Sequence, residues 1–214
     1  GSDFYKSSKN DLTKKESYLK KAIVIQVETD AVKEDVMKAF PSVKDKVVAC
    51  NYGIDLFEFI DRNREKKDCV LLTQVKERIV LTCGYNGSPA QQHLRIIQIL
   101  DSLSFSFKNR LFLFFPMTYG IPSEDYLNEV RSSLEKTGIL YYIFTKRLSD
   151  DDLSKLRLQT SIVINVQVTD SFSSSLVEHL YAGNVLIAGN WLPYSFMSLK
   201  AIRISCAIAR RLIL

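Results

Sequence analysis

Two carboxylates, Asp170 and Glu178, stand eight residues apart in the stretch TDSFSSSLVEHLYAGNVLIAGNW, which begins at residue 169. The stretch follows the apolar run SIVINVQV, so the chain leaves a predicted buried strand through polar residues and then enters a predicted helix. A carboxylate only accepts hydrogen bonds and has four lone-pair sites, so Glu178 could bind both hydroxyls of a ribose. Asp170 could contact a second hydroxylated group. The competing interpretation makes Glu178 a solvated surface residue and Asp170 a helix cap.

Two polar segments could hold an anion. YNGSPA enters a predicted helix through Gly87, and SFSSS offers successive backbone N–H groups and hydroxyls. Unpaired N–H groups and the macrodipole at a helix N-terminus favour negative charge. The same residues also form ordinary caps and turns, and both interpretations stay open. The loops contain neither Gly-x-Gly-x-x-Gly nor Gly-x4-Gly-Lys, which disfavours a standard dinucleotide or P-loop site.

Alternating strands and helices must position these residues. The predicted strands span residues 78–86, 109–117, 139–144, 161–168 and 184–189. The predicted helices between them span residues 88–103, 122–138, 149–158 and 173–183. Strands that are apolar throughout and alternate with amphipathic helices predict an α/β fold with a doubly wound parallel sheet. Ligands of such sheets bind beyond the carboxyl ends of the strands, in the loops GYNGSP, PMTYGIP, FTKRLSD and TDSFSSS.

Two helix boundaries have clear local signals. Ser88 is a predicted N-cap, and Pro89 takes the first helical position, where its missing N–H costs nothing. Gly138 is predicted to end the helix that begins near residue 122, because glycine readily adopts the left-handed conformation there.

The N-terminal part forms a short extension before this alternation. The first twenty residues are polar and rich in lysine, and are predicted to be either a frayed helix or a linker. Strands are predicted at 22–27 and 46–55, with a helix at 29–40 between them. The charged segment 60–68 is interpreted as an exposed connection.

Charge and hydropathy argue against several classes of partner. The net charge of +5 comes from 29 basic and 24 acidic residues, and it is too small and dispersed to indicate nucleic-acid binding. No secretory signal is visible in the given residues, and none of their apolar runs reaches about 18–20 residues, the length that crosses a bilayer.

Cysteine and histidine spacing predicts no metal site. The four cysteines show neither a pairing pattern nor the short spacings of zinc ligands, and the two histidines are far apart. These residues are Cys50, Cys69, Cys83, Cys206, His93 and His179. The cysteine usage fits a reducing cytoplasm best.

The segment DSFSSSLVEHLYAG resembles the E-x7-E motif, E-x-F-G-x4-E-A-x-A-x-G, of the GT-B-fold glycosyltransferases. In this comparison the motif positions are taken by Asp170, Phe172, Ser173, Glu178 and Gly183. The resemblance implies that the second acid binds the ribose of a nucleotide sugar, while the first lies near the transferred sugar. Asp170 and Ser173 depart from the motif, which has Glu and Gly there.

Other segments resemble the same family. CGYNGSPAQQHLRIIQIL and FPMTYGIPSEDYLNEV are similar to bacterial 4-acetamido-4,6-dideoxygalactose transferases, although that subfamily lacks the second acid. The segment from Thr29 to Asp55 resembles the end of an N-terminal GT-B domain. The usual Arg/Lys pair after the first strand of the donor domain is missing, so subfamily and stereochemistry stay open.

The resemblance covers residues 22–195 and implies a domain organisation. Residues 1–21 would be a tag, with Gly1-Ser2 as its scar, and a polar lead-in. Residues 22–68 would be a remnant of the N-terminal domain with its linker, and residues 69–195 a Rossmann-like domain that binds a nucleotide sugar. Residues 196–214 would form a basic helix that lies on an anionic membrane, packs on the missing domain or joins the core.

The implied function is that of a hexosyltransferase-type glycosyltransferase, acting from a nucleotide-sugar donor on a polysaccharide or lipid-linked glycan. No cofactor or metal is expected, and the location would be cytoplasmic, with peripheral contact at the inner face of the plasma membrane as an option. The base that activates the acceptor would come from the missing N-terminal domain, so this chain should bind nucleotide but transfer sugar poorly. The expected donor-binding residues are Asn86, Gly87, Thr118, Tyr119, Thr145, Lys146, Leu148, Asp170, Phe172, Ser173, Ser174 and Glu178.

Different residues of this set would contact different groups of the donor. Glu178 would hold the ribose, Asn86, Gly87, Ser173 and Ser174 would lie near the diphosphate, and the loop from Thr145 to Leu148 would border the base.

Two alternatives remain beside this interpretation. One is a non-catalytic α/β module that binds nucleotide or protein, for example a receiver-like domain, although CGYNG lacks the acidic cluster that a receiver needs. The other is a different transferase of the same architecture, such as a pyruvyl transferase.

Overall fold

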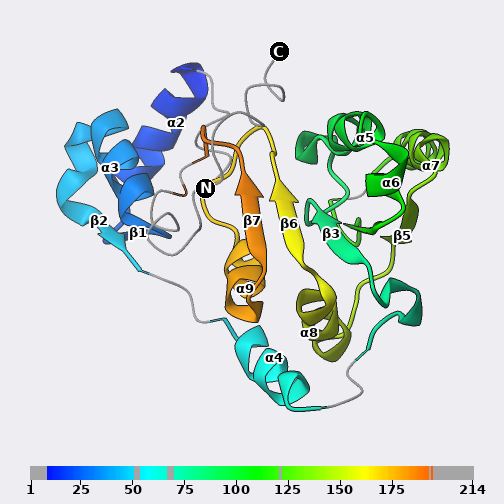
Figure 1. Cartoon of the computed structure of the whole chain (residues 1–214). Coiled ribbons are helices and arrows are strands. Elements are labelled where there is room, and N and C mark those ends of the chain that lie inside the picture. The colour runs from blue at the N-terminus through cyan, green and yellow to red at the C-terminus, as the bar shows by residue number, and fades with distance from the viewer. Residues whose placement is uncertain (1–8, 51–53, 67–69, 121, 193, 195–214) are drawn as a thin grey trace. The chain divides into compact units, whose positions relative to one another are not determined.

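The computed structural model describes residues 9–50, 54–66, 70–120, 122–192 and 194. These residues form two compact units (Figure 1). The larger unit takes its described residues from 54–168 and 174–189, and the smaller unit takes the rest, including 169–173.

A five-stranded parallel sheet forms the centre of the larger unit. Its strands are β3 (Ile79–Cys83), β4 (Leu111–Pro116), β5 (Leu140–Phe144), β6 (Ile162–Asn165) and β7 (Val185–Ala188). The spatial order is β5-β4-β3-β6-β7, so the chain moves outward from β3 in one direction and then returns to continue in the other. This order reverses between β3 and β6, the place where open α/β sheets form their ligand crevice. The prediction of an α/β fold with a doubly wound parallel sheet is confirmed.

Helices cover both faces of this sheet (Figure 1). The α-helices of the larger unit are α4 (Leu56–Arg64), α5 (His93–Asp101), α6 (Phe105–Lys108), α7 (Glu124–Thr137), α8 (Asp150–Gln159) and α9 (Ser174–Ala182). Two 3-10 turns, η2 (Thr73–Val75) and η3 (Pro89–Gln91), precede β3 and α5. Helices α5 and α7 pack on one face, while α8 and α9 lie on the other.

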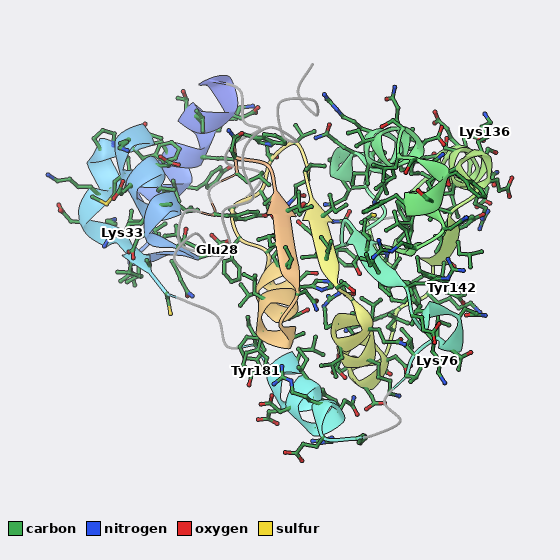
Figure 2. The ribbon with its side chains drawn as sticks, in the orientation of Figure 1. Glu28, Lys33, Lys76, Lys136, Tyr142 and Tyr181 are labelled. Atoms are coloured by element: carbon green, nitrogen blue, oxygen red, sulfur yellow. The ribbon has the colours of Figure 1, made fainter. Side chains whose placement is uncertain are left out.

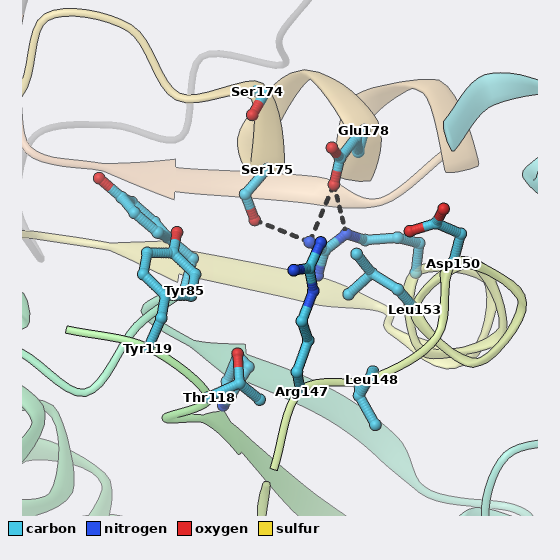
Figure 3. A pocket seen from close by; sticks show the side chains of 12 residues that line it. Tyr85, Thr118, Tyr119, Arg147, Leu148, Asp150, Leu153, Ser174, Ser175 and Glu178 are labelled. Atoms are coloured by element: carbon cyan, nitrogen blue, oxygen red, sulfur yellow. Dashed lines mark hydrogen bonds and ion pairs between the residues drawn. The ribbon is translucent and has the colours of Figure 1, made fainter. Parts of the chain in front are cut away.

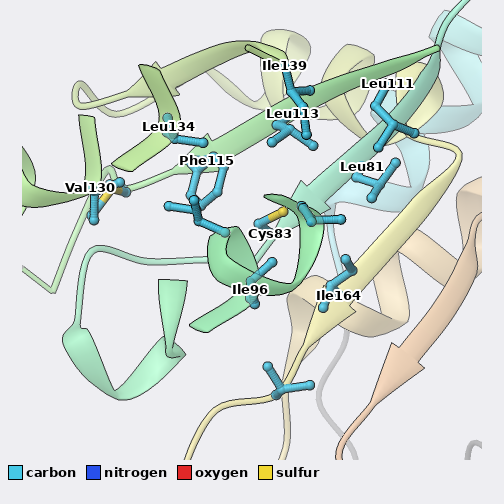
Figure 4. Close-up of a cluster of buried hydrophobic side chains, with 14 of the residues drawn as sticks. Leu81, Cys83, Ile96, Leu111, Leu113, Phe115, Val130, Leu134, Ile139 and Ile164 are labelled. Atoms are coloured by element: carbon cyan, nitrogen blue, oxygen red, sulfur yellow. The ribbon is translucent and has the colours of Figure 1, made fainter. Parts of the chain in front are cut away.

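The central strands are buried on both faces because their apolar side chains alternate between two clusters. On β4, Leu113 and Phe115 belong to the cluster that α5 and α7 cover (Figure 4). Phe112 and Phe114 belong to the opposite cluster, which includes Leu156 of α8. A strand buried on both sides needs an uninterrupted apolar run, and the run LFLFF of β4 provides it.

Local hydrogen bonds explain where several helices begin and end. The Ser88 hydroxyl accepts from the Ala90 N–H before η3, with Pro89 at the first position of that turn. The Ser123 hydroxyl accepts from the Tyr126 N–H and caps α7. Gly138 ends α7 with a φ of 70°, the left-handed conformation that glycine adopts at little cost. The prediction for Gly138 is confirmed. Ser88 caps the turn η3 and not the predicted helix, because Gln92 takes the left-handed conformation and α5 begins only at His93.

The prediction of an exposed connection at 60–68 is wrong for its first part. Residues 56–64 form α4, in which Leu56, Ile60 and Asn63 are buried. Their spacing of four and three residues places them on one face of the helix. The Asn63 amide donates to the Ser154 hydroxyl of α8 at 2.6 Å, so α4 is part of the larger unit. The charged residues of the segment lie on the other face of α4, and their number hides the spacing of the buried residues in the sequence.

The smaller unit has a two-stranded parallel sheet and its own core. Strands β1 (Ile25–Val27) and β2 (Val47–Ala49) pair, and the remaining elements are α2 (Lys9–Leu19), α3 (Asp30–Ala39) and η1 (Pro41–Lys46). Residues 9–19 are therefore helical, one of the two alternatives for the lead-in. The basic segment 196–214 lies outside the described residues.

None of the helices in the described part of the chain has both the length and the apolar character that crossing a membrane requires.

Candidate functional site

A pocket of about 350 Å³ opens in the larger unit beyond the carboxyl ends of its strands (Figure 3). It lies within the size range of small-molecule sites in proteins. The loops after β3, β4 and β5 contribute to its wall, together with α8 and the first turns of α9. Its lining residues are Tyr85, Pro116, Thr118, Tyr119, Arg147, Leu148, Asp150, Leu153, Arg157, Ser174, Ser175 and Glu178.

A buried ion pair holds Glu178 at the wall of this pocket. Oε2 of Glu178 accepts from Nε of Arg157 at 3.1 Å and from Nη2 at 2.9 Å (Figure 3). The two side chains are only 4% and 11% exposed, Arg157 being the more buried. The other carboxylate oxygen, Oε1, makes no hydrogen bond to any described residue. Glu178 is thus fixed through one oxygen and has the other available to a ligand.

Hydrogen bonds around Arg157 determine the protonation of His179. Nη1 of Arg157 lies 2.9 Å from Nε2 of His179, and Nδ1 of His179 lies 2.6 Å from Oδ1 of Asn184. Because arginine can only donate, Nε2 accepts and the imidazole proton resides on Nδ1, which donates to Asn184. Burial, and then the charge of Arg157, hold the pKa of His179 well below its ordinary value. His179 is therefore neutral, and it positions Arg157 rather than competing for Glu178.

Arg157 stays charged in this environment. Burial lowers its pKa, while the neighbouring Glu178 carboxylate opposes that change. A third partner, the Ser175 hydroxyl, accepts from Nη2 at 3.0 Å. Buried charge of this kind persists only when it is paired and hydrogen-bonded.

Two tyrosines form the aromatic part of the wall. The ring centroids of Tyr85 and Tyr119 are 6.4 Å apart, and the rings are tilted by 35°. Nε2 of Gln167 donates to the Tyr85 hydroxyl at 2.8 Å, and Gln167 also accepts from the buried Gln91 at 2.7 Å. Gln167 thus fixes the position of the Tyr85 hydroxyl, whereas the Tyr119 side chain is 56% exposed.

Asn86 and Gly87 shape the loop after β3 but do not line the pocket. Oδ1 of Asn86 accepts from the Ser88 N–H at 2.8 Å, and the Gly87 N–H donates to the Tyr119 carbonyl at 2.7 Å. A Cβ at residue 87 would lie 2.5 Å from Cδ of Pro122, so only glycine allows this close approach. These contacts join the loops that carry Tyr85 and Tyr119.

The structure brings together some of the residues expected to bind the donor. Those that line the pocket are Thr118, Tyr119, Leu148, Ser174 and Glu178. Thr145 and Lys146 follow β5 as exposed residues and do not line it.

The other three expected residues, Asp170, Phe172 and Ser173, belong to the smaller unit. Asp170 is 6% exposed and already has partners there, since its carboxylate accepts from the Ser171 N–H at 2.9 Å and from the Tyr194 hydroxyl. The two acids of the E-x7-E-like segment therefore belong to different units.

Sequence reasoning missed several lining residues. Asp150, Leu153 and Arg157 come from one helix, α8, with a spacing of three and four residues. This spacing puts them on one face of α8 and is the signal that could have found them. Arg147 lies within the loop expected to border the base but was not singled out, and Tyr85 and Ser175 adjoin expected residues.

The described residues contain no group of three or more His, Cys, Asp or Glu side chains that could hold a metal ion. Cys50 is exposed, and burial raises the pKa of the Cys83 thiol. Cys69 and Cys206 lie outside the described residues.

Comparisons with solved structures identify the fold. A glycosyltransferase from Rickettsia africae is 14% identical, with a TM-score of 0.67 over 86% of this chain and 48% of that one. Anabaena HepE in complex with UDP-glucose is 15% identical, with a TM-score of 0.63 over 96% and 57% of the two chains. A UDP-forming trehalose-phosphate synthase from Burkholderia xenovorans is 14% identical, with a TM-score of 0.64 over 89% and 53%.

All three solved structures are GT-B glycosyltransferases, and this chain spans about half of their length. No protein-family model matches the sequence, and neither does any curated protein.

Proposed function

We propose that this chain, which has the fold of the GT-B glycosyltransferases, is the part of a glycosyltransferase that binds the nucleotide-sugar donor. The observation that carries the proposal is Glu178, held by Arg157 so that Oε1 is available beside the N-terminal turn of α9. Oε1 would accept the ribose hydroxyls, and the positive end of the α9 macrodipole would face the diphosphate. Anabaena HepE, which shares the fold, was solved with UDP and with UDP-glucose.

The reaction is the transfer of a hexose to a hydroxyl of a polysaccharide or lipid-linked glycan. The bond between sugar carbon C1 and the diphosphate oxygen breaks, and its electron pair stays on the nucleoside diphosphate. The acceptor oxygen bonds to C1 while a base takes the acceptor proton. The resemblance to GT-B enzymes assigns that base to the N-terminal domain, and the reaction to the cytoplasm, with the inner membrane face as a second location.

Calorimetric titration with UDP, GDP, TDP and CMP tests the proposal. We expect one of these nucleotides to bind the wild-type chain, and Glu178→Gln to weaken that binding roughly tenfold, equivalent to about 1.4 kcal/mol. Glutamine retains an oxygen that can accept from Arg157, so the variant should remain folded. Glu58→Gln, an exposed substitution on α4, is the matched control and should bind like the wild type.

A second titration locates the contact on the ribose. The wild-type chain should prefer the ribonucleotide over its 2′,3′-dideoxy form, and Glu178→Gln should lose most of that preference. Failure of the folded wild-type chain to bind any of the four nucleotides at millimolar concentration would contradict the proposal.

A further inference from the structure

The distribution of basic residues around the pocket is uneven. The loops after β3, β4 and β6 contain no Lys or Arg, and neither does the first turn of α9. The loop after β5 contains Lys146 and Arg147, of which only Arg147 lines the pocket. The other arginine of the wall, Arg157, is already engaged by Glu178, Ser175 and His179.

Arg147 is available to a ligand. Its side chain is exposed and makes no hydrogen bond or ion pair within the described part of the chain. Figure 3 shows it reaching from its loop toward the side of the pocket where Ser175 and Glu178 lie. In the same view Asp150, whose carboxylate has no partner among the residues that the structure describes, lies away from Ser174 and Ser175.

The formal charges of the pocket wall cancel, so an anionic ligand needs a cation that is not already paired. The wall carries two cations, Arg147 and Arg157, and two carboxylates, Asp150 and Glu178. The N-terminus of α9 adds the equivalent of about half a positive charge. A nucleoside diphosphate carries at least two negative charges, and Arg157 is already neutralised by its partner. Arg147 is therefore the side chain that can balance the diphosphate.

A ribose bound at Glu178 would bring the diphosphate to the side of the pocket toward which Arg147 reaches. Ser174 and Glu178 are four residues apart, one turn of helix, which corresponds to a rise of about 6 Å. Ribose and diphosphate are adjacent groups of a nucleotide, so a ribose at Glu178 brings the phosphates to the first turn of α9. A guanidinium can bind two phosphate oxygens at once through its planar fork of N–H donors.

We propose that Arg147 binds the diphosphate of the donor and supplies the positive charge that the other strand-end loops lack. This assignment rests on the proposed function and adds a residue to it. Loss of Arg147 should weaken the binding of a nucleoside diphosphate while leaving the binding of the nucleoside nearly unchanged.

The test compares UDP, GDP and TDP with uridine, guanosine and thymidine on the wild-type chain, Arg147→Ala and Arg147→Lys. For the diphosphate that binds, Arg147→Ala should weaken binding roughly 10- to 100-fold, the effect of losing a charged hydrogen bond. The matching nucleoside should bind within about twofold of the wild type, because it presents no charge to Arg147. Arg147→Lys should recover part of the loss, since lysine keeps the charge without the fork.

Lys136→Ala is the matched control, because Lys136 is an exposed cation at the outer edge of the larger unit, on α7 (Figure 2). It removes one positive charge away from the pocket and should change neither titration. If Arg147→Ala weakens nucleoside and diphosphate equally, or neither, the assignment of Arg147 is wrong.

The two proposals fail differently. If Glu178→Gln abolishes the preference for ribose while Arg147→Ala has no effect, the donor-binding function stands and only the role of Arg147 is lost. If the folded wild-type chain binds no nucleoside diphosphate, the proposed function fails and the assignment of Arg147 fails with it.

Discussion

Glu178 has two roles at the scale of single residues, and each uses one oxygen of the carboxylate. Oε2 neutralises a buried arginine, while Oε1 makes no hydrogen bond to a described residue. Removal of the side chain therefore affects stability as well as binding, and the two effects need separate variants.

Glu178→Ala should lower the free energy of unfolding by about 3–5 kcal/mol, because it leaves the Arg157 charge buried without its partner. The double variant Arg157→Met with Glu178→Met should recover most of that loss, since both charges are removed together. Urea unfolding followed by circular dichroism measures both effects.

Arg131→Ala is the control for this experiment. Arg131 and Glu124 form an exposed pair on α7 at 3.8 Å, and pairs of this kind contribute less than about 1 kcal/mol. If Arg131→Ala and Glu178→Ala lower the free energy of unfolding equally, breaking the buried pair costs no more than breaking an exposed one, and the prediction is wrong.

His93 should make the larger unit less stable in acid. It is fully buried, and burial lowers its pKa from 6.5 to about 4. Between these two values the unfolded chain binds a proton that the folded chain does not, so stability falls as the pH decreases. This pKa shift corresponds to about 3 kcal/mol of stability, which is present above pH 6.5 and is lost as the pH falls to 4.

The measurement is the free energy of unfolding of the wild-type chain and His93→Gln between pH 4 and pH 8. Their difference should change across this range, because the variant lacks the titrating group while His179 and the carboxylates are common to both. NMR should also show no titration of the His93 ring above pH 5. Parallel stability curves, with a His93 ring that titrates near its ordinary pKa, would refute the prediction.

At the scale of elements, α8 and α9 form one wall of the pocket beyond the carboxyl ends of the strands. One face of α8 supplies Leu153 and Arg157, and the first two turns of α9 supply Ser174 and Glu178. Helix α4 packs against both helices and so supports the wall from outside.

Ile60→Ala should destabilise the larger unit by about 2–5 kcal/mol, because Ile60 is fully buried on α4 and its loss creates a cavity. Glu58→Ala, on the exposed side of the same helix, should change the free energy of unfolding by less than about 0.5 kcal/mol. If urea unfolding shows that Ile60→Ala and Glu58→Ala change the free energy of unfolding by equally small amounts, α4 is an exposed connection and not part of the core.

At the scale of the whole molecule, the chain has about half the length of the GT-B enzymes that share its fold. We expect it to bind a nucleoside diphosphate without transferring sugar efficiently. At 100 times its dissociation constant, the nucleotide should add about 2.7 kcal/mol of stability, which a thermal-shift screen detects as a higher melting temperature. Efficient sugar transfer by this chain alone would show that the base does not depend on another domain.

The sequence by itself determined the five strands of the larger unit, the helices α5, α7, α8 and α9 between them, and the parallel arrangement of the strands. Apolar runs such as that of β4, and end signals such as Gly138, act over a few residues, and burial on both faces leaves an uninterrupted apolar run. The loops that could carry the site followed from this arrangement, because parallel strands bring their carboxyl ends to one edge.

Only the tertiary structure decided which side chains meet at that edge. Arg157 and Glu178 are 21 residues apart, and no periodicity specifies that one pairs with the other. A pattern shows which face of a helix is buried, but not what covers it. The ion pair, the position of Arg147 in the pocket and the packing of α4 all depend on how distant helices pack against one sheet.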